Sequence, residues 1–204
     1  MTLITKDDVN ACVNVLKQGG IVVHPSKSSY GIGVDASSPE AVRKVNDLKQ
    51  RDTSKHYICL VSDLKMAQEY AELSEKEIKV IKNLMPGPIT IVSRKKQGSP
   101  ELLDKDYFRF RIACVDIVRN IVEKLGKPII STSANISSQK PLYKIKDVID
   151  MFDNRVDIII DAGDLKEKPC STVVRIEPFA IFRHGPISQI QIEIAMAKVK
   201  MYLE

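Results

Sequence analysis

The chain has 204 residues, of which 44% are hydrophobic and 28% charged, and its formal net charge is +5. These values are ordinary for a globular protein, and a chain of this size buries roughly 70% of its unfolded surface, so we expect a single domain over residues 1–204. No run of about 18 apolar residues is available to span a membrane, and the opening MTLITKDDVN lacks the apolar core of a signal peptide. These features predict a cytosolic protein.

The mild basic excess permits anionic partners such as nucleotides, pyrophosphate or RNA, without choosing among them. Trp is absent and only 5% of the residues are aromatic, which disfavours an RNA module that stacks on bases. The Cys and His residues are far apart and form no ligand spacing, so no metal site is predicted. We expect them instead to be small buried side chains: Cys12, Cys59, Cys114, Cys170, His24, His56 and His184.

The first predicted elements are a helix, a strand and a polar loop. Apolar residues at helical spacing indicate a helix over residues 9–16, with Thr5 as the candidate cap and Gly19 at its end. A short β-branched strand over residues 21–23 follows. It leads into a loop rich in Ser and Gly over residues 26–33.

Later segments continue this alternation. Further helices are predicted over residues 39–49, 116–125 and 145–152, with two short ones between residues 61 and 85, of which the second opens with a capping box at 74–77. Strands are predicted over residues 57–61, 89–93, 108–112, 129–131, 158–160, 172–176 and 180–183, with a loop over 94–100. The tail over 189–196 alternates in polarity but is rich in helix formers, so strand and helix both remain open. This order predicts an α/β fold with a mixed sheet.

Hydroxyl groups gather where predicted strands end. Residues 24–33 carry hydroxyls, a lysine and two glycines, which suit hydrogen bonds to a polar ligand, although a plain turn is equally consistent. The segment is neither a Walker loop nor a dinucleotide fingerprint, because both glycine patterns are absent. Residues 131–135 and 171–172 add more hydroxyls and an amide. No His and carboxylate pair accompanies these serines, so we interpret them as binding groups and not as nucleophiles.

Cations cluster after the second predicted helix. Lys49, Arg51 and Lys55 lie within seven residues. Lys49 is also explained by the negative C-terminal end of its helix, whereas the other two lie beyond that explanation. Guanidinium groups bind phosphate oxygens in pairs, so Arg51, Arg111 and Arg183 suit a triphosphate if the fold brings them together.

Short motifs succeed one another along residues 19–187. They are GGIVVHP at 19–25, YGIG at 30–33, KQR at 49–51, PGPIT at 86–90, FRI at 110–112, STSAN at 131–135, STVV at 171–174 and RHG at 183–185. Each is weak alone, but as an ordered set the chain resembles the YrdC family. The resemblance implies a twisted mixed α/β sheet with flanking helices and an open central cavity, and threonylcarbamoyl-AMP synthase activity.

The family's reaction joins L-threonine, bicarbonate and ATP, with Mg²⁺ on the nucleotide, and needs no permanently bound cofactor or metal. By the resemblance, Lys49 and Arg51 are the catalytic cations, and the ATP-binding residues are Lys49, Arg51, Lys55, Asn135, Tyr143 and Arg183. The threonine-binding residues are Ser28, Tyr30, Arg111, Ser133 and Ser171. The product would serve N6-threonylcarbamoyladenosine formation in tRNA through a separate transferase, with tRNA or double-stranded RNA as a possible contact.

The chain departs from the family pattern at several positions. Ser26-Lys27-Ser28 replaces the usual Thr-Glu-Thr, and Leu60 stands where some members have a histidine. The chain ends near residue 204, so we expect it to lack the extra C-terminal domain of longer members. Two alternatives remain open: an RNA- or ribosome-binding YrdC- or YciO-like protein without this activity, and a carbamoyl-adenylate enzyme with another acceptor.

Overall fold

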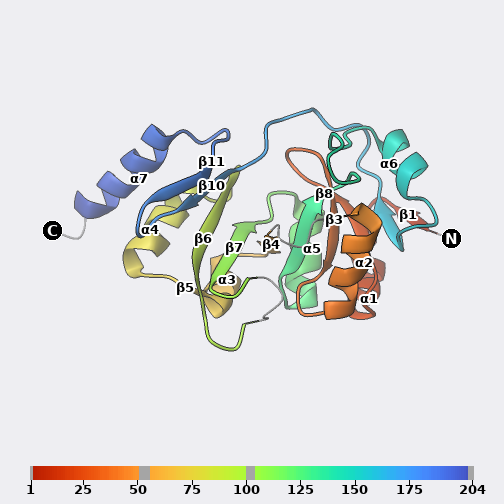
Figure 1. Cartoon of the computed structure of the whole chain (residues 1–204), viewed down its shortest axis with the longest axis horizontal. Coiled ribbons are helices and arrows are strands. Elements are labelled where there is room, and N and C mark those ends of the chain that lie inside the picture. Colours follow the sequence, from red (N-terminus) through yellow and green to blue (C-terminus); the bar gives the residue numbers. More distant parts are fainter. Residues whose placement is uncertain (1, 51–55, 100–103, 202–204) are drawn as a thin grey trace.

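The structure, a computed structural model, describes residues 2–50, 56–99 and 104–201 (Figure 1). Within them, all strands join one sheet in the order β1-β9-β2-β3-β8-β4-β7-β6-β10-β11, with β5 paired to β6. The strands are β1 (Leu3–Thr5), β2 (Val22–Pro25), β3 (Tyr30–Asp35), β4 (Ile58–Val61), β5 (Ala71–Glu72), β6 (Ile89–Lys95), β7 (Tyr107–Ile112), β8 (Ile129–Ser133), β9 (Ile158–Ile160), β10 (Thr172–Arg175) and β11 (Ala180–Arg183). Parallel and antiparallel pairs both occur, so the predicted mixed α/β sheet is confirmed.

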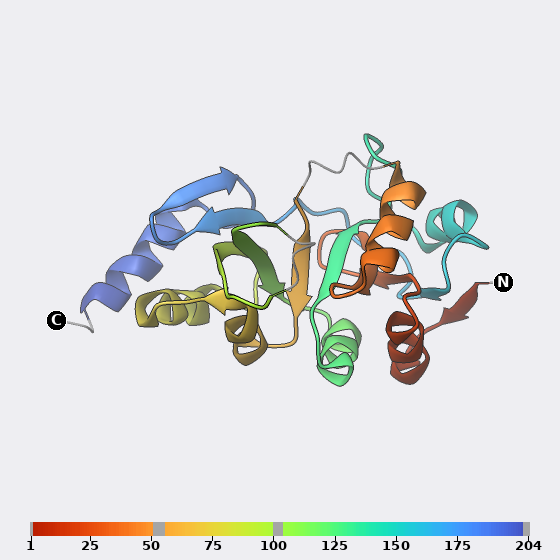
Figure 2. The same ribbon diagram turned by 60° about the horizontal axis from the view of Figure 1, so that its bottom comes forward.

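Helices flank this sheet as the sequence predicted. They are α1 (Val9–Lys17), α2 (Pro39–Lys49), α3 (Leu64–Tyr70), α4 (Glu75–Leu84), α5 (Asp116–Leu125), α6 (Ile145–Phe152) and α7 (Gln189–Met201). Figure 2 shows α1 and α5 side by side against the sheet, and α7 packs on α4. In the described part of the chain, no helix combines the length and the apolar character that crossing a membrane requires.

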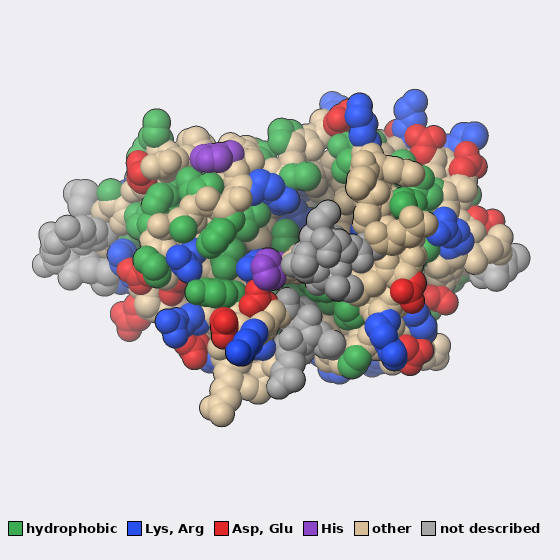
Figure 3. All heavy atoms as spheres, viewed as in Figure 1, with side chains coloured by type: hydrophobic (Ala, Val, Ile, Leu, Met, Phe, Trp, Pro, Cys, Tyr) green, Lys and Arg blue, Asp and Glu red, His purple; other side chains and the backbone are tan. Residues whose placement is uncertain are grey.

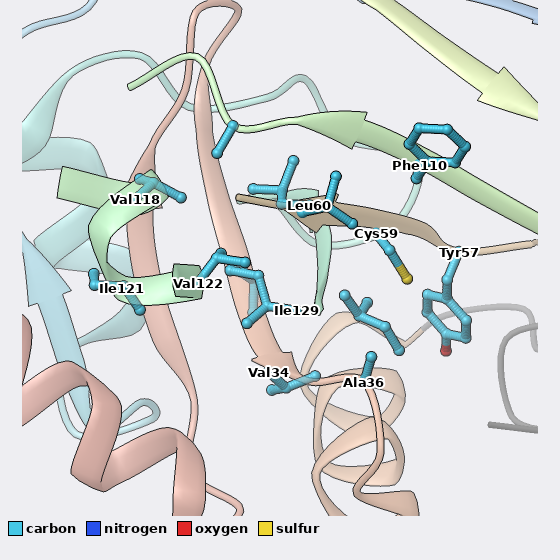
Figure 4. Close-up of a cluster of buried hydrophobic side chains, with 14 of the residues drawn as sticks. Val34, Ala36, Tyr57, Cys59, Leu60, Phe110, Val118, Ile121, Val122 and Ile129 are labelled. Atoms are coloured by element: carbon cyan, nitrogen blue, oxygen red, sulfur yellow. The ribbon is translucent and has the colours of Figure 1, made fainter. Parts of the chain in front are cut away.

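The core lies between the sheet and these helices. Figure 4 shows one part of it, where Leu60 of β4 and Ile129 of β8 meet Val118 and Val122 of α5. All four side chains are buried. Because α5 presents its apolar face at helical spacing and ends at Gly126 in the left-handed region (φ 72°), its sequence specified both its length and its orientation.

Helix boundaries follow the predicted caps with one correction. Ser38 caps α2 by accepting from Ala41 N, with a proline at the helix start, and the capping box of α4 is present at Ser74. Thr5, however, is not the cap of α1. Asp8 accepts from Ala11 N at 2.8 Å, whereas Thr5 Oγ1 accepts from Asp8 N one turn earlier. Thr5 therefore stabilises the approach to the helix and not its first turn.

One segment predicted as a loop is a strand, and two predicted strands are longer than expected. Residues 30–33 belong to β3, which pairs with β2 in an antiparallel hairpin, so the loop after β2 is only residues 26–29. Strand β8 was predicted to end at Ser131 but also includes Thr132 and Ser133, because it pairs with β3. Likewise, Arg94 and Lys95 extend β6 because β5 pairs with them. Pairing partners distant in sequence override the weak local strand propensity of these Gly- and Ser-rich segments.

The tail is a helix, since Ile192, Ala195 and Val199 of α7 are buried at helical spacing. Burial of the cysteines differs from the prediction at the C-terminal pair. Cys12 and Cys59 are buried, but Cys114 is only partly buried and Cys170 is exposed. Cys170 lies in residues 161–171, a segment without helix or strand that we name the strap. It connects β9 to β10 across the intervening strands of the sheet (Figure 1).

Candidate functional site

Two neighbouring cavities open near the centre of the sheet. One has a volume of about 380 Å³ and is lined mainly by hydroxyl and guanidinium groups; we name it the polar cavity. The other has a volume of about 400 Å³ and is lined mainly by aliphatic and proline side chains; we name it the apolar cavity. Ser26, Ser28, Arg111 and Ser171 line both. Figure 3 shows Lys or Arg side chains beside a hollow near the centre of this face.

The fold brings together many of the predicted site residues. Ser28, Tyr30, Arg111, Ser133, Ser171 and Arg183 all line the polar cavity. Lys49, Asn135 and Tyr143 line neither cavity. Arg51 and Lys55 lie outside the described residues.

The loop over residues 26–29 is held by one hydroxyl group. Ser26 Oγ donates to Ser29 O at 2.7 Å and accepts from the backbone N–H groups of Ser28 and Ser29, each at 3.3 Å. Such a local ring of hydrogen bonds fixes a short turn without help from the rest of the chain. Ser26 therefore shapes the loop, and Ser28 is left at the boundary between the cavities.

Arg183 and the end of the strap form one hydrogen-bonded unit. Arg183 Nε donates to Ser171 O at 2.9 Å, and its Nη2 donates to Ser171 Oγ at 3.1 Å. Ser171 Oγ also lies 2.9 Å from the hydroxyl of buried Thr90. A Cβ at Gly185 would lie 2.5 Å from Cys170 O and from Thr172 N, so only glycine allows this close approach. Gly185 therefore lets the chain after β11 pack closely against residues 170–172, and this contact helps to place Arg183 at the cavity.

Arg111 is the deepest cation of the polar cavity. Within the described residues its guanidinium has neither a carboxylate nor another hydrogen-bond partner, although it lies between the two cavities. Burial lowers the pKa of Arg111, Cys114 offsets part of this by raising the pKa, and the nearby charge of Arg183 lowers it by a smaller amount, with the smallest effect, a raising one, from Cys170. A partly buried guanidinium without a carboxylate partner loses hydration, so this geometry favours an anionic ligand.

Lys49 differs from Arg111 in that it is a buried cation with several hydrogen-bond partners. Its side chain is 2% exposed, and Nζ donates to Ser133 O, Asn135 O and Asn135 Oδ1 at 2.5, 2.6 and 3.0 Å. Asn135 also accepts from Ser133 Oγ and donates to Gln139 O, each at 2.6 Å. The KQR and STSAN motifs therefore meet through Lys49, which ties the end of α2 to the end of β8.

Tyr30 and Tyr143 both contact the strap. Tyr30 Oη donates to Gly163 O at 2.7 Å and accepts from Ala162 N at 3.1 Å. Tyr143 O accepts from Leu165 N at 2.8 Å. Burial raises the pKa of Tyr143, with smaller contributions from Glu167 and Cys170, both on the strap. These two residues therefore hold the strap near the cavity.

His24 is a site component that the sequence analysis missed. Its ring is 1% exposed and lies across β3, where a Cβ at Gly31 or Gly33 would come within 3.0 Å of it. Nδ1 lies 3.1 Å from Pro25 O and Nε2 lies 3.1 Å from Ser131 Oγ, which lines the polar cavity. Burial lowers the pKa of His24 to about 4, so the ring is neutral at pH 7.

This arrangement fixes the protons of His24. A carbonyl only accepts, so Nδ1 carries the hydrogen and Nε2 accepts from the Ser131 hydroxyl. Ser131 therefore presents lone pairs to the cavity. The two glycines of the YGIG motif were the available signal, because paired glycines in a strand often mark a close approach of another group.

Comparison with known proteins assigns the chain to a protein family. The Sua5/YciO/YrdC model, described as telomere recombination, matches residues 14–185. The chain belongs to the Sua5/YciO/YrdC family. Its relatives in this family include a protein of Methanocaldococcus jannaschii named putative threonylcarbamoyl-AMP synthase, which is 35% identical over 159 residues, or 78% of this chain and 75% of that protein. The threonylcarbamoyl-AMP synthase of Psychromonas ingrahamii is 31% identical over 79% of this chain and 88% of its own length.

A solved structure of the family has the same fold. P. abyssi Sua5, crystallised with L-threonine, superposes with a TM-score of 0.86 at 23% sequence identity. The match covers 96% of this chain and 60% of that chain, so the protein described here spans about three fifths of that Sua5 chain. The twisted α/β architecture of the Sua5/YciO/YrdC family is therefore confirmed.

The described residues offer no cluster of three or more His, Cys, Asp or Glu side chains that could hold a metal ion. The polar side chains of the two cavities are mainly hydroxyls and cations, together with the imidazole of His56 and the thiols of Cys114 and Cys170. Hydroxyl and guanidinium groups bind anions and sugar or amino-acid hydroxyls, and this is the chemistry that the site offers.

Proposed function

We propose that the protein is a nucleotidyltransferase that forms threonylcarbamoyl-AMP and pyrophosphate from L-threonine, bicarbonate and ATP. The observation that carries the proposal is the pair Arg111 and Arg183 at one cavity, because neither guanidinium has a carboxylate partner within the described residues. A substrate carboxylate and a polyphosphate are the anions that this reaction brings together. The names of the family relatives support the same activity.

The proposed roles divide the site residues between the substrates. Arg111 binds the threonine carboxylate, and Ser28, Ser133 and Ser171 bind its remaining polar groups, with Tyr30 positioning the strap. Arg183, Arg51 and Lys55 bind the triphosphate, which enters with its Mg²⁺, while Asn135 and Tyr143 border the nucleotide. Lys49 contributes through the loop that it holds, and the catalytic effect of Lys49 and Arg51 is charge neutralisation.

The chemistry needs no protein nucleophile. The threonine amine attacks the carbon of bicarbonate, a C–N bond forms, and water leaves to give a carbamate. A carbamate oxygen then attacks the α-phosphorus of ATP, a P–O bond forms, and the bond to pyrophosphate breaks. Holding the two reactants together and neutralising the departing charge are the tasks that a cavity of cations and hydroxyls performs.

The product is a reactive mixed anhydride, so we propose that a separate transferase delivers its threonylcarbamoyl group to tRNA in the cytosol. Contact of this protein with tRNA or double-stranded RNA is part of the same proposal. Salt-sensitive RNA binding that is indifferent to ATP would instead favour a binding protein of the same fold.

Pyrophosphate release tests the proposed function. We expect release from Mg-ATP that requires L-threonine and bicarbonate together, with no release when either is omitted. Mass spectrometry of the quenched reaction should show the adenylate. ATP binding without any release under these conditions would contradict the proposed activity and leave only the fold assignment.

A further inference from the structure

His56 and Asp104 meet at the polar cavity. His56 lines this cavity, and its side chain is 57% exposed, although the sequence analysis expected it to be buried. Its Nδ1 lies 3.0 Å from Asp104 Oδ2. Figure 3 shows a His side chain beside the hollow, with acidic and basic side chains next to it. The pair therefore places an imidazole where both solvent and a ligand of the cavity can reach it.

Asp104 is held in place by its own loop and by β7. Its Oδ1 accepts from the backbone N–H groups of Asp106 and Tyr107, at 2.9 and 3.2 Å, and its carboxylate forms an ion pair with Arg109. The Asp104 side chain is only 9% exposed. Burial raises the pKa of Asp104, but the hydrogen bonds from Arg109 and Asp106 outweigh it and lower the pKa below its usual value. A fixed, ionised carboxylate therefore lies against the ring of His56.

This contact determines which ring nitrogen of His56 can take up a proton. A carboxylate oxygen only accepts, so Nδ1 is the nitrogen that carries the ring hydrogen beside Asp104. In the neutral ring the lone pair then belongs to Nε2. A carboxylate that orients an imidazole in this way also stabilises the imidazolium that forms when Nε2 takes a proton. The pair has the arrangement that general-base catalysis requires.

The sheet register places His56 beside the threonine site of the proposed function, on which this step rests. Ile58, two residues after His56, pairs with Ser131 of the antiparallel strand β8. Continued by two residues, this register brings His56 level with Ser133. Ser133 and Arg111 line the same cavity as His56, and both are assigned to threonine. The imidazole and the threonine amine therefore share one cavity.

We propose that His56 is the general base of the reaction and that Asp104 positions it. The threonine amine is mainly protonated at neutral pH and cannot attack until it loses a proton. His56 Nε2 takes that proton, and the freed lone pair forms the C–N bond to bicarbonate. A second amine proton leaves with the bicarbonate hydroxyl as water, and the carbamate remains. The exposed imidazolium then returns its proton to solvent.

Substitution of His56 tests this role on the full chain. Pyrophosphate release is measured with Mg-ATP, bicarbonate and L-threonine. We expect His56→Ala, and His56→Gln, which cannot take up a proton, to lower kcat about 100-fold and to change KM for ATP less than about threefold. The control His184→Gln makes the same change at another exposed histidine and should keep full activity. A kcat within about threefold of wild type in His56→Ala or His56→Gln would overturn the inference.

Free imidazole separates base catalysis from a structural role. Because the position of His56 is open to solvent, we expect imidazole in the buffer to raise kcat of His56→Ala at least about tenfold. Pyrazole, a ring of the same size but a much weaker base, should restore nothing. Loss without rescue, or equal rescue by both rings, would overturn the role of His56 and leave the proposed function standing. If the wild type releases no pyrophosphate, the proposed function fails and the role of His56 fails with it.

Asp104 is tested through its coupling to His56. Asp104→Asn should lower kcat about tenfold in the wild type but not in His56→Ala, because only a base that is present can be positioned. The control Asp106→Asn changes an exposed neighbour and should leave kcat unchanged in both. Equal losses from Asp104→Asn in the two backgrounds would assign Asp104 a purely structural role and overturn its part in the inference.

Discussion

Lys49 is a buried cation and Arg111 a partly buried one beside the same site, and their surroundings differ. The ammonium of Lys49 donates to three oxygen atoms of residues 133–135. The guanidinium of Arg111 has no such partner within the described residues. The first cation completes the fold, whereas the second still has its donors available to a ligand.

This contrast separates two groups of polar residues around the polar cavity. On the side of β2, β3 and β8, polar groups such as His24, Tyr30 and Asn135 bond to neighbouring side chains or to backbone atoms. On the side of β7 and β11, Arg111 lines the cavity without a hydrogen-bond partner among the described residues, and Arg183 lines it while bonding to Ser171 at its edge. We conclude that the first group positions the walls, and that the second binds the anionic parts of the substrates.

Removal of Lys49 should have the largest effect on stability. Lys49→Met removes the ammonium donor from Ser133 O and Asn135 O and one of the two donors of Asn135 Oδ1, so we expect the free energy of unfolding to fall by about 4 kcal/mol. Urea unfolding measures this change. Lys44→Met on the same helix is the control, because Lys44 is half exposed and pairs with Glu40 on the surface. A loss below about 1 kcal/mol for Lys49→Met would show that its hydrogen bonds are not structural.

Acidification should destabilise the protein through His24. Its pKa is lowered from 6.5 to about 4 by burial, so the unfolded chain binds its proton first as the pH falls. The stabilising effect of the neutral ring is complete above about pH 6.5 and is lost towards pH 4, a change of about 3 kcal/mol. Urea unfolding of wild type and His24→Asn at pH 7 and pH 4 measures the difference, with exposed His184→Asn as control. Equal pH dependence in all three would contradict the buried, neutral ring.

Arg111→Met should separate binding from folding. We expect kcat/KM for L-threonine to fall about 100-fold, equivalent to about 3 kcal/mol, because the carboxylate loses its cation. The free energy of unfolding should not fall, since removal of an unpaired buried charge relieves desolvation. Arg119→Met on α5, where Arg119 pairs with Asp116 at the surface, is the control and should keep full activity. Unfolding of Arg111→Met at lower urea would instead assign Arg111 a structural role.

The difference between local and long-range contacts explains how much of the fold could be predicted from the sequence. Boundaries of α2, α5 and α6 were predicted closely because caps and apolar spacing are local signals. Residues 30–33 were expected to be a loop, and the strand predicted over 129–131 continues to residue 133, because these strand segments depend on pairing partners far along the chain. His24 made the prediction of β3 harder still. Its ring packs over Gly31 and Gly33, which have no side chains of their own to indicate a buried strand.

The residues of the site were easier to predict than their roles. Hydroxyls and arginines at strand ends indicated a polar anion site, and the resemblance named Arg111 and Arg183. Nothing local could show that Lys49 would be directed at residues 133–135, because that contact joins segments brought together only by the sheet. The apolar cavity was also invisible, since Leu60, Ala113 and Val118 look like ordinary core residues in sequence.

Arg183→Ala should have the smallest effect of the series, because Arg183 is exposed and shares the triphosphate with other cations in the proposed site. We expect kcat/KM for ATP to fall about tenfold, equivalent to about 1.4 kcal/mol, with partial recovery in Arg183→Lys. Arg175→Ala is the matched control on the neighbouring strand, where Arg175 stacks on Tyr107 and Phe182 and donates to Pro178 O. It should lower stability slightly and leave ATP turnover unchanged. If Arg183→Ala retains full turnover while Arg175→Ala loses it, the anion site lies on the outer face of β10 and β11 and not in the polar cavity.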